Sequence, residues 1–187
     1  MADAKITEFT TFTDTELGAL AYLAGAIPGS PGSNRKLQIK QGFFTPQLGI
    51  PSSGEPTGVV LAAGTGGYFL RIGSLVLVKG NVRITNKGSS TGSYVTIRKL
   101  PYEVDQSGPY YLPDGVHGGF RVYGSAMTGL SGSLGGKAGY DPVTPTFDAI
   151  QVFQSSGTGN DLAISNANLV NACVIGFEGI YHTSIAF

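Results

Sequence analysis

The sequence predicts an all-β protein, an antiparallel jelly-roll-like β-sandwich with an extended N-terminal arm, from three observations. Glycine makes up 29 of the 187 residues and only 13% of the residues are charged, which suits strands and tight turns better than helices. Apolar and polar residues alternate with period two in several stretches after residue 68, as they do in strands with one buried face. Roughly seven or eight such strands between glycine and proline turns are typical of a sandwich.

Residues 1–41 are predicted to form the N-terminal arm. The segment "TDTE", Thr13 to Glu16, fits a capping box before a short helix in "LGALAYLAG". Equally, "LAYLAG" and "KLQIKQ" flank the Pro/Gly-rich "AIPGSPGSN" and fit two short strands joined by a loop. With so little apolar content the arm cannot bury a core of its own, so we expect it to become ordered on a neighbouring subunit or a larger particle.

Residues 42–67 are predicted to be a connector, and residues 68–187 the β-sandwich head domain. The connector contains Pro46, Pro51 and Pro56 with frequent glycine, and neither helical nor strand periodicity is sustained in it. It is therefore expected to be an extended link between arm and head.

The clearest strand of the head runs from Ser74 to Thr85. Its alternation separates a buried face from a solvated one. The buried face is expected to contain Val76, Val78, Gly80, Val82 and Ile84. The solvated face is expected to contain Lys79, Asn81, Arg83 and Thr85. After the turn "NKGSSTG" the alternation resumes until Pro101, so this second strand is predicted to return as a hairpin. In that hairpin Arg98 would lie on the outward face beside Lys79 and Arg83.

Later strands are predicted in "FRVYGSAMTGL", "GYDPV", "FDAIQVFQS" and "NACVIGFEGIYHTSIAF". The last of these places Cys173, Ile175, Phe177 and Tyr181 on one side of the strand. Cys173 is the single cysteine, so no internal disulfide and no cysteine-based zinc cage can form. We expect Cys173 to be a buried structural thiol.

Composition and motifs argue against several classes of function. The formal net charge is zero, so no global field attracts the chain to nucleic acid, and no apolar run is long enough for membrane insertion. His117 near Asp114 matches no established metal motif. In "SGSLGGKAG", Ser131 and Ala138 replace residues that a phosphate-binding loop requires. We therefore expect no catalytic residues, no metal and no cofactor.

Two groups of residues are candidates for ligand binding. Six basic residues and no acidic one lie between Gly58 and Tyr102, and the predicted hairpin gathers Lys79, Arg83 and Arg98 on one face. Such a row can bind carboxylate or phosphate groups, or it can merely keep an exposed strand from pairing with another sheet. Tyr110 and Tyr111, in aromatic-rich loops, can stack on sugar rings or form core and subunit contacts.

Three segments resemble proteins of tailed bacteriophages. The stretch "GGYFLRIGSLVLVKGNVRITNKGSSTG…IRKLPY", Gly66 to Tyr102, is similar to the opening of the carboxy-terminal β-sandwich of tail fibres and receptor-binding proteins. "DLAISNANLVNACVIGFEGIYHT", Asp161 to Thr183, is similar to the closing section of that domain. Lys5 to Gln41 resembles segments that attach such proteins to the virion.

This resemblance implies a homotrimeric, non-enzymatic protein on the virion surface, made in the host cytoplasm and used in host adsorption. The arm, residues 1–41, would dock on baseplate, tail or major capsid proteins, and the head would bind a host receptor, with a surface glycan as one candidate. Outward Leu75 and Leu77 are expected to form trimer contacts, because an exposed apolar patch favours a partner.

Two alternatives stay open at this stage. Tail fibres carry a long shaft, whereas this connector is short. The chain is therefore also compatible with a capsid decoration (cement) protein that stabilises the head shell. A host-glycan depolymerase would need carboxylates that converge from different strands, and such enzymes are usually longer stacked solenoids.

Overall fold

The computed structural model describes residues 21–25, 35–50, 56–92, 94–105, 118–130, 132–141, 146–155 and 161–184. In this part of the chain nearly all regular structure is antiparallel strand. The elements are β1 (Ala21–Gly25), β2 (Arg35–Phe44), β3 (Gln47–Gly49), β4 (Val59–Leu61), β5 (Gly66–Ile72), β6 (Leu75–Lys87), β7 (Val95–Arg98), β8 (Gly118–Ser125), β9 (Ser133–Asp141), β10 (Thr146–Ser155), β11 (Asp161–Ala163), the 3₁₀ helix η1 (Asn166–Asn168) and β12 (Val174–His182).

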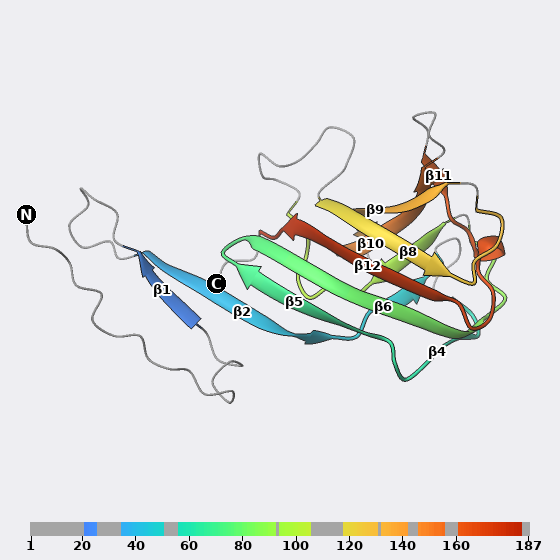
Figure 1. Ribbon diagram of the computed structural model, residues 1–187, viewed down its shortest axis with the longest axis horizontal. Coiled ribbons are helices and arrows are strands. Elements are labelled where there is room, and N and C mark those ends of the chain that lie inside the picture. Colours follow the sequence, from blue (N-terminus) through green and yellow to red (C-terminus); the bar gives the residue numbers. More distant parts are fainter. Residues whose placement is uncertain are drawn as a thin grey trace, which may run out of the picture.

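The strands form one continuous curled sheet in the order β1-β2-β5-β6-β12-β8-β9-β10-β7-β3, with β11 beside β10 and β4 beside β6. Because the sheet curls, β5, β6, β12 and β8 form a front layer, and β10, β7 and β3 lie behind it (Figure 1). The predicted all-β, antiparallel, sandwich-like fold is confirmed.

The core lies between the two layers. The alternation predicted for residues 74–85 is confirmed, since Val76, Val82 and Ile84 are buried whereas Lys79 and Arg83 are exposed. The residues that face the same core from β12 and the position just before it are Cys173, Ile175, Phe177 and Tyr181, as predicted. The back layer contributes Val95, Ile97, Ile150 and Val152. Cys173 is a free, fully buried thiol.

The predicted hairpin between the two strands around "NKGSSTG" is wrong. Both long edges of β6 are occupied, by β5 on one side and by β12 on the other. The chain therefore crosses to the back layer after β6, where β7 pairs with β10 and β3. All four residues of β7 are buried in this layer, so Arg98 does not lie on the outward face with Lys79 and Arg83.

The N-terminal region contains the two strands that one of the alternatives predicted, because β1 pairs with β2 from Ala21↔Ile39 to Gly25↔Arg35. Thr13 to Glu16, where the helix alternative begins, lies outside the described residues. The pairing of β2 with β5 runs on past residue 41 to Phe44↔Gly67. Figure 1 shows β1 and the start of β2 extending beyond the sandwich.

Four segments of the predicted connector, residues 42–67, are also in strands: the end of β2, all of β3 and β4, and the first two residues of β5. Residues 42–44 complete β2, and β3 adds an edge strand to β7. Gly42 leaves room for the ring of Phe69 on β5, since a Cβ atom on it would lie 2.9 Å from Cε1 of that ring. Backbone pairing with β5 and β7 thus holds this part of the connector. Its proline and glycine content had indicated an extended link without strands.

Candidate functional site

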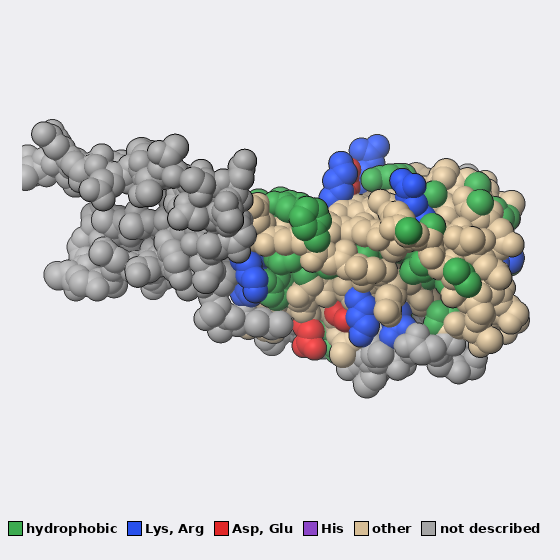
Figure 2. Space-filling model, turned by 90° about the horizontal axis from the view of Figure 1, so that it is seen from below, with side chains coloured by type: hydrophobic (Ala, Val, Ile, Leu, Met, Phe, Trp, Pro, Cys, Tyr) green, Lys and Arg blue, Asp and Glu red, His purple; other side chains and the backbone are tan. Residues whose placement is uncertain are grey.

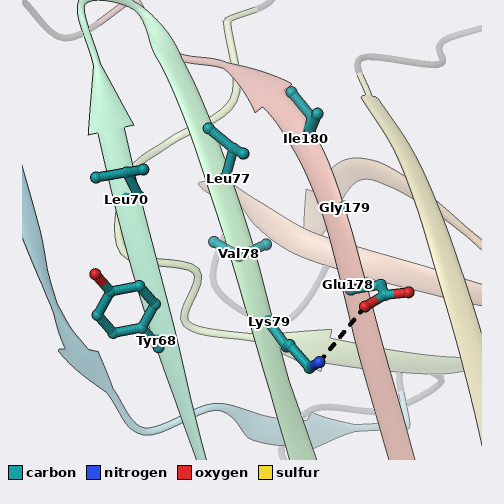
Figure 3. A pocket seen from close by; sticks show the side chains of 8 residues that line it. All are labelled: Tyr68, Leu70, Leu77, Val78, Lys79, Glu178, Gly179 and Ile180. Carbon is teal, nitrogen blue, oxygen red and sulfur yellow. Dashed lines mark ion pairs between the residues drawn. The ribbon is translucent and has the colours of Figure 1, made fainter.

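The outward face of β5, β6 and β12 is a set of straight cross-strand rows. Leu70, Leu77 and Ile180 are register partners in one row, and Tyr68, Lys79 and Glu178 are partners in a neighbouring row. Figure 3 shows both rows side by side on the three strands. Cross-strand neighbours on one face interact directly, so each row acts as one surface unit.

The first row belongs to an apolar half of this face. Ile72 and Leu75 are partners in the adjacent row, and Ile180 is 47% exposed. A hollow of about 430 Å³ opens over these rows, lined by Tyr68, Leu70, Leu77, Val78, Lys79, Glu178, Gly179 and Ile180. Leu75 and Leu77 thus lie on the outward face, as the alternation indicates, and their contact with another subunit stays a prediction.

An exposed aromatic pair lies beside the apolar half. Phe43 on β2 is 88% exposed, and its ring meets that of Tyr68 edge-on at 5.7 Å between centroids. The hydroxyl of Tyr68 donates to the side-chain oxygen of Gln41, which fixes the ring. A second hollow, of about 460 Å³, lies next to this pair and includes Thr65 and Asn81. Sequence periodicity missed the pair because Phe43 fell within the predicted connector.

The charged residues of the second row partly neutralise one another. Lys79 Nζ lies 3.8 Å from Glu178 Oε2, and Arg121 of β8 is the register partner of Glu178 on the other side. Glu178 is far from Lys79 in the sequence, so the local run of basic residues did not reveal the pairing. The field around Lys79 is therefore weaker than its sequence neighbourhood indicates.

The predicted basic row is reduced from three residues to two. Arg83 is exposed on the same face of β6 as Lys79, and its Nε donates to Asn81 Oδ1 at 3.3 Å. Arg98 is fully buried in the back layer. Figure 2 shows Lys and Arg side chains at separate places over the visible surface rather than in one cluster.

Some predicted residues lie outside the described part of the chain, among them Tyr110, Tyr111, Asp114 and His117. Their roles stay predictions. Among the described residues, no group of three or more His, Cys, Asp or Glu side chains could hold a metal ion. In the same part of the chain, no helix is long and apolar enough to cross a membrane.

A third hollow, of about 430 Å³, lies between the predicted turn that follows β6 and the segment around η1, and neither was predicted as a binding site. Its lining consists of Lys87, Gly88, Ser89, Ser90, Thr91, Gly92, Ser165, Asn166 and Ala167. We call it the distal pocket, because η1 and the end of β6 lie at the end of the molecule opposite β1 (Figure 1). The sequence signal was "SNAN": Ser165 and Asn168 form a reciprocal capping box around η1.

Among solved structures, the fold is similar to part of the Dettilon tailspike protein. The similarity has a TM-score of 0.55 at 21% sequence identity, and it covers 77% of this chain and 24% of that chain. This chain thus spans about a quarter of the length of that protein. No family model matches the sequence, and no curated protein matches it. At this identity the similarity shows a shared fold.

Proposed function

We propose that the protein is a non-enzymatic structural component of a phage virion surface whose head domain binds a host receptor. The fold shared with part of a tailspike protein over 77% of the chain carries this proposal. The β1–β2 extension beyond the sandwich supports an arm that attaches the head to other virion proteins through residues 1–41. No feature of the described residues favours capsid decoration over this assignment.

The outward face has an apolar half and a polar half along β6, and we assign a different role to each. The apolar rows, with Leu75 and Leu77, lie where β6 begins, and Arg83 and Lys87 lie toward its other end. Because monomeric proteins rarely expose contiguous apolar surface beyond a few hundred Å², we propose that copies of the chain associate through the apolar half. The family resemblance implies a homotrimer, which is one of the closed symmetric assemblies that such an association can form.

The polar half of the same face would then point toward the host. Lys79 and Arg83 are exposed there, and cations at such positions attract acidic surface polymers over about one Debye length. In this proposal Tyr110 and Tyr111 add stacking surface for a host glycan. The receptor role and the self-association are separable, since they use different rows.

The full chain, fluorescently labelled, tests the receptor role on a panel of bacterial strains. We expect binding to the surface of a strain, loss of phage adsorption to that strain when unlabelled protein is added, and weaker binding at high salt. Lys79→Gln together with Arg83→Gln should reduce the salt dependence of cell binding. Lys99→Gln should not, because Lys99 is an exposed residue directly after β7 and lies outside this face.

Three results would contradict the proposal. These are no binding to any strain whose phage carries the protein, antibody labelling over the capsid instead of the tail, and release of reducing sugar from host polysaccharide by the purified chain. The second would favour capsid decoration, and the third would favour a depolymerase.

A further inference from the structure

The distal pocket is built by two loops that are tied together. The segment that follows β6, residues 88–92, provides one wall, and residues 165–167 provide the other. Asn166 Nδ2 donates to the carbonyl oxygen of Ser90, and Lys87 Nζ donates to the carbonyl oxygen of Asn166 at 3.3 Å. Ser90 Oγ in turn accepts from the backbone N–H of Thr57 at 2.8 Å. The pocket walls are therefore positioned before any ligand arrives.

Asn166 carries the strongest sign of a ligand. The residue is only 9% exposed, and its Oδ1 receives no hydrogen bond from any described residue. A buried amide oxygen without a donor is unfavourable. Since Asn166 lines the pocket, a hydroxyl group entering from that side would supply the missing donor with a small movement of the loops.

The rest of the lining selects the chemistry of the ligand. Ser89 and Thr91 offer hydroxyl groups that both donate and accept, and Ser90 Oγ, which accepts from Thr57, has a hydrogen to donate. The Ser165 hydroxyl is used in the cap of η1. Lys87 is the one charged residue in the lining, which contains no aromatic side chain. Its contact with Asn166 uses one of three ammonium hydrogens. The pocket is thus suited to a polar ligand that carries a negative charge.

From this arrangement we infer that the distal pocket binds one carboxylate-bearing sugar residue, with the carboxylate at Lys87 and the sugar hydroxyls at Ser90, Thr91 and Asn166 Oδ1. A volume of about 430 Å³ is adequate for a single sugar residue. One lysine matches the single charge of a carboxylate better than a phosphate monoester, which carries about −1.5 to −2. This inference rests on the proposed receptor role and assigns the ligand class.

A matched pair of sugars tests it on the full chain. Methyl β-glucuronide and methyl β-glucoside share a ring and differ in carboxylate against hydroxymethyl, and saturation-transfer NMR measures the dissociation constant of each. We expect the glucuronide to bind at least about tenfold more tightly, a difference of about 1.4 kcal/mol. Lys87→Gln should remove that preference, and Lys99→Gln, with the same loss of charge outside the pocket, should keep it.

Thr91→Ala keeps the charge and removes one hydroxyl, so it should weaken both sugars about equally. Equal binding of the two sugars to the native chain, or an unchanged preference in Lys87→Gln, would overturn the inference. Absence of glucuronide binding at millimolar concentration would overturn it as well. The receptor role has its own readout: if Lys87→Gln still binds host cells fully, the pocket assignment fails and the receptor role stands. If the native chain binds glucuronide but no cells, the receptor role fails.

Discussion

The aliphatic part of Arg98 occupies the space that a side chain on Gly49 would need. A Cβ atom on Gly49 would lie 2.5 Å from Cδ of Arg98 and 2.3 Å from Oγ1 of Thr96. Gly49 is the register partner of Thr96 where β3 joins β7, and Arg98 is fully buried. Arg98 is therefore part of the packing of the back layer rather than of a ligand surface.

Arg98→Ala should destabilise the protein by about 2–5 kcal/mol, because a large buried side chain leaves a cavity and its polar contacts are lost. Arg83→Ala is the matched control: Arg83 is exposed, so its loss should change stability by less than about 0.5 kcal/mol. Urea unfolding followed by circular dichroism measures both values. A stability of Arg98→Ala within that same small range would show that Arg98 is not needed for packing.

Ile180→Asp should dissociate copies of the chain without unfolding them. Ile180 is 47% exposed beside Leu77, so a carboxylate is tolerated in the isolated chain but costly when buried against a neighbour. We expect the native chain to elute at three chain masses in light scattering, and the dissociation constant to rise at least about 100-fold in the variant.

Thr85→Asp places the same charge at an exposed outward position of β6, away from the apolar rows, and should leave the mass unchanged. A monomeric native chain, or equal masses for the native chain and Ile180→Asp, would exclude association through the apolar half.

Gly80 and Gly176 should respond differently to alanine. A Cβ atom on Gly80 would lie 2.8 Å from the Gly66 carbonyl oxygen and 2.9 Å from the Gly67 Cα, and backbone atoms of a paired strand cannot move aside. Gly80→Ala should therefore cost about 1–3 kcal/mol or more. At Gly176 the obstacle is the ring of Tyr123, at 2.0 Å.

That ring is 48% exposed and can turn into solvent. Gly176→Ala should therefore cost less than about 1 kcal/mol. Thermal unfolding of the two variants makes the comparison, and a lower midpoint for Gly176→Ala than for Gly80→Ala would refute the distinction.

The protein should lose stability in alkaline solution. Burial raises the pKa of the Cys173 thiol and of the Tyr181 hydroxyl, so both groups keep their protons longer in the folded chain than in the unfolded one. Their contribution is fully present below the unfolded pKa values, about 8.5 for Cys and about 10 for Tyr, and it is lost as pH rises above them.

Urea unfolding between about pH 7 and pH 10 should show a fall of up to about 1.4 kcal/mol per pH unit from Cys173. Cys173→Ala removes the thiol and should flatten this part of the curve. An equally steep curve in that variant would assign the fall to other groups.

Alternation along a strand predicted faces well and partners poorly. In β6 the buried and exposed residues follow period two, because one side meets the core and the other meets solvent. The same period in residues 94–100 says nothing about which edge the next strand joins, so β7 was predicted beside β6 although both edges of β6 are taken. With the partner wrong, Arg98 was placed on the wrong layer.

The candidate site was predictable only in part, for the same reason. Lys79, Leu75 and Leu77 follow from the local pattern of one strand. Their neighbours Glu178 and Ile180 come from the end of the chain, and cross-strand register is a tertiary property that no local pattern contains. The two N-terminal strands, by contrast, were among the alternatives, since a Pro/Gly loop between two apolar segments is a local signal.

The hydrogen bond from Asn166 to Ser90 joins loops that lie far apart in the chain. One loop follows β6 and the other precedes β12. These two strands pair with each other, and their outer edges pair with β5 and β4 on one side and with β8 on the other. Both loops can thus change during evolution, and with them the ligand preference, while the apolar rows of β5, β6 and β12 stay the same. Replacing one loop alone would remove the hydrogen bonds that position the other loop. A transplant between related chains should therefore exchange residues 87–92 and 165–168 together.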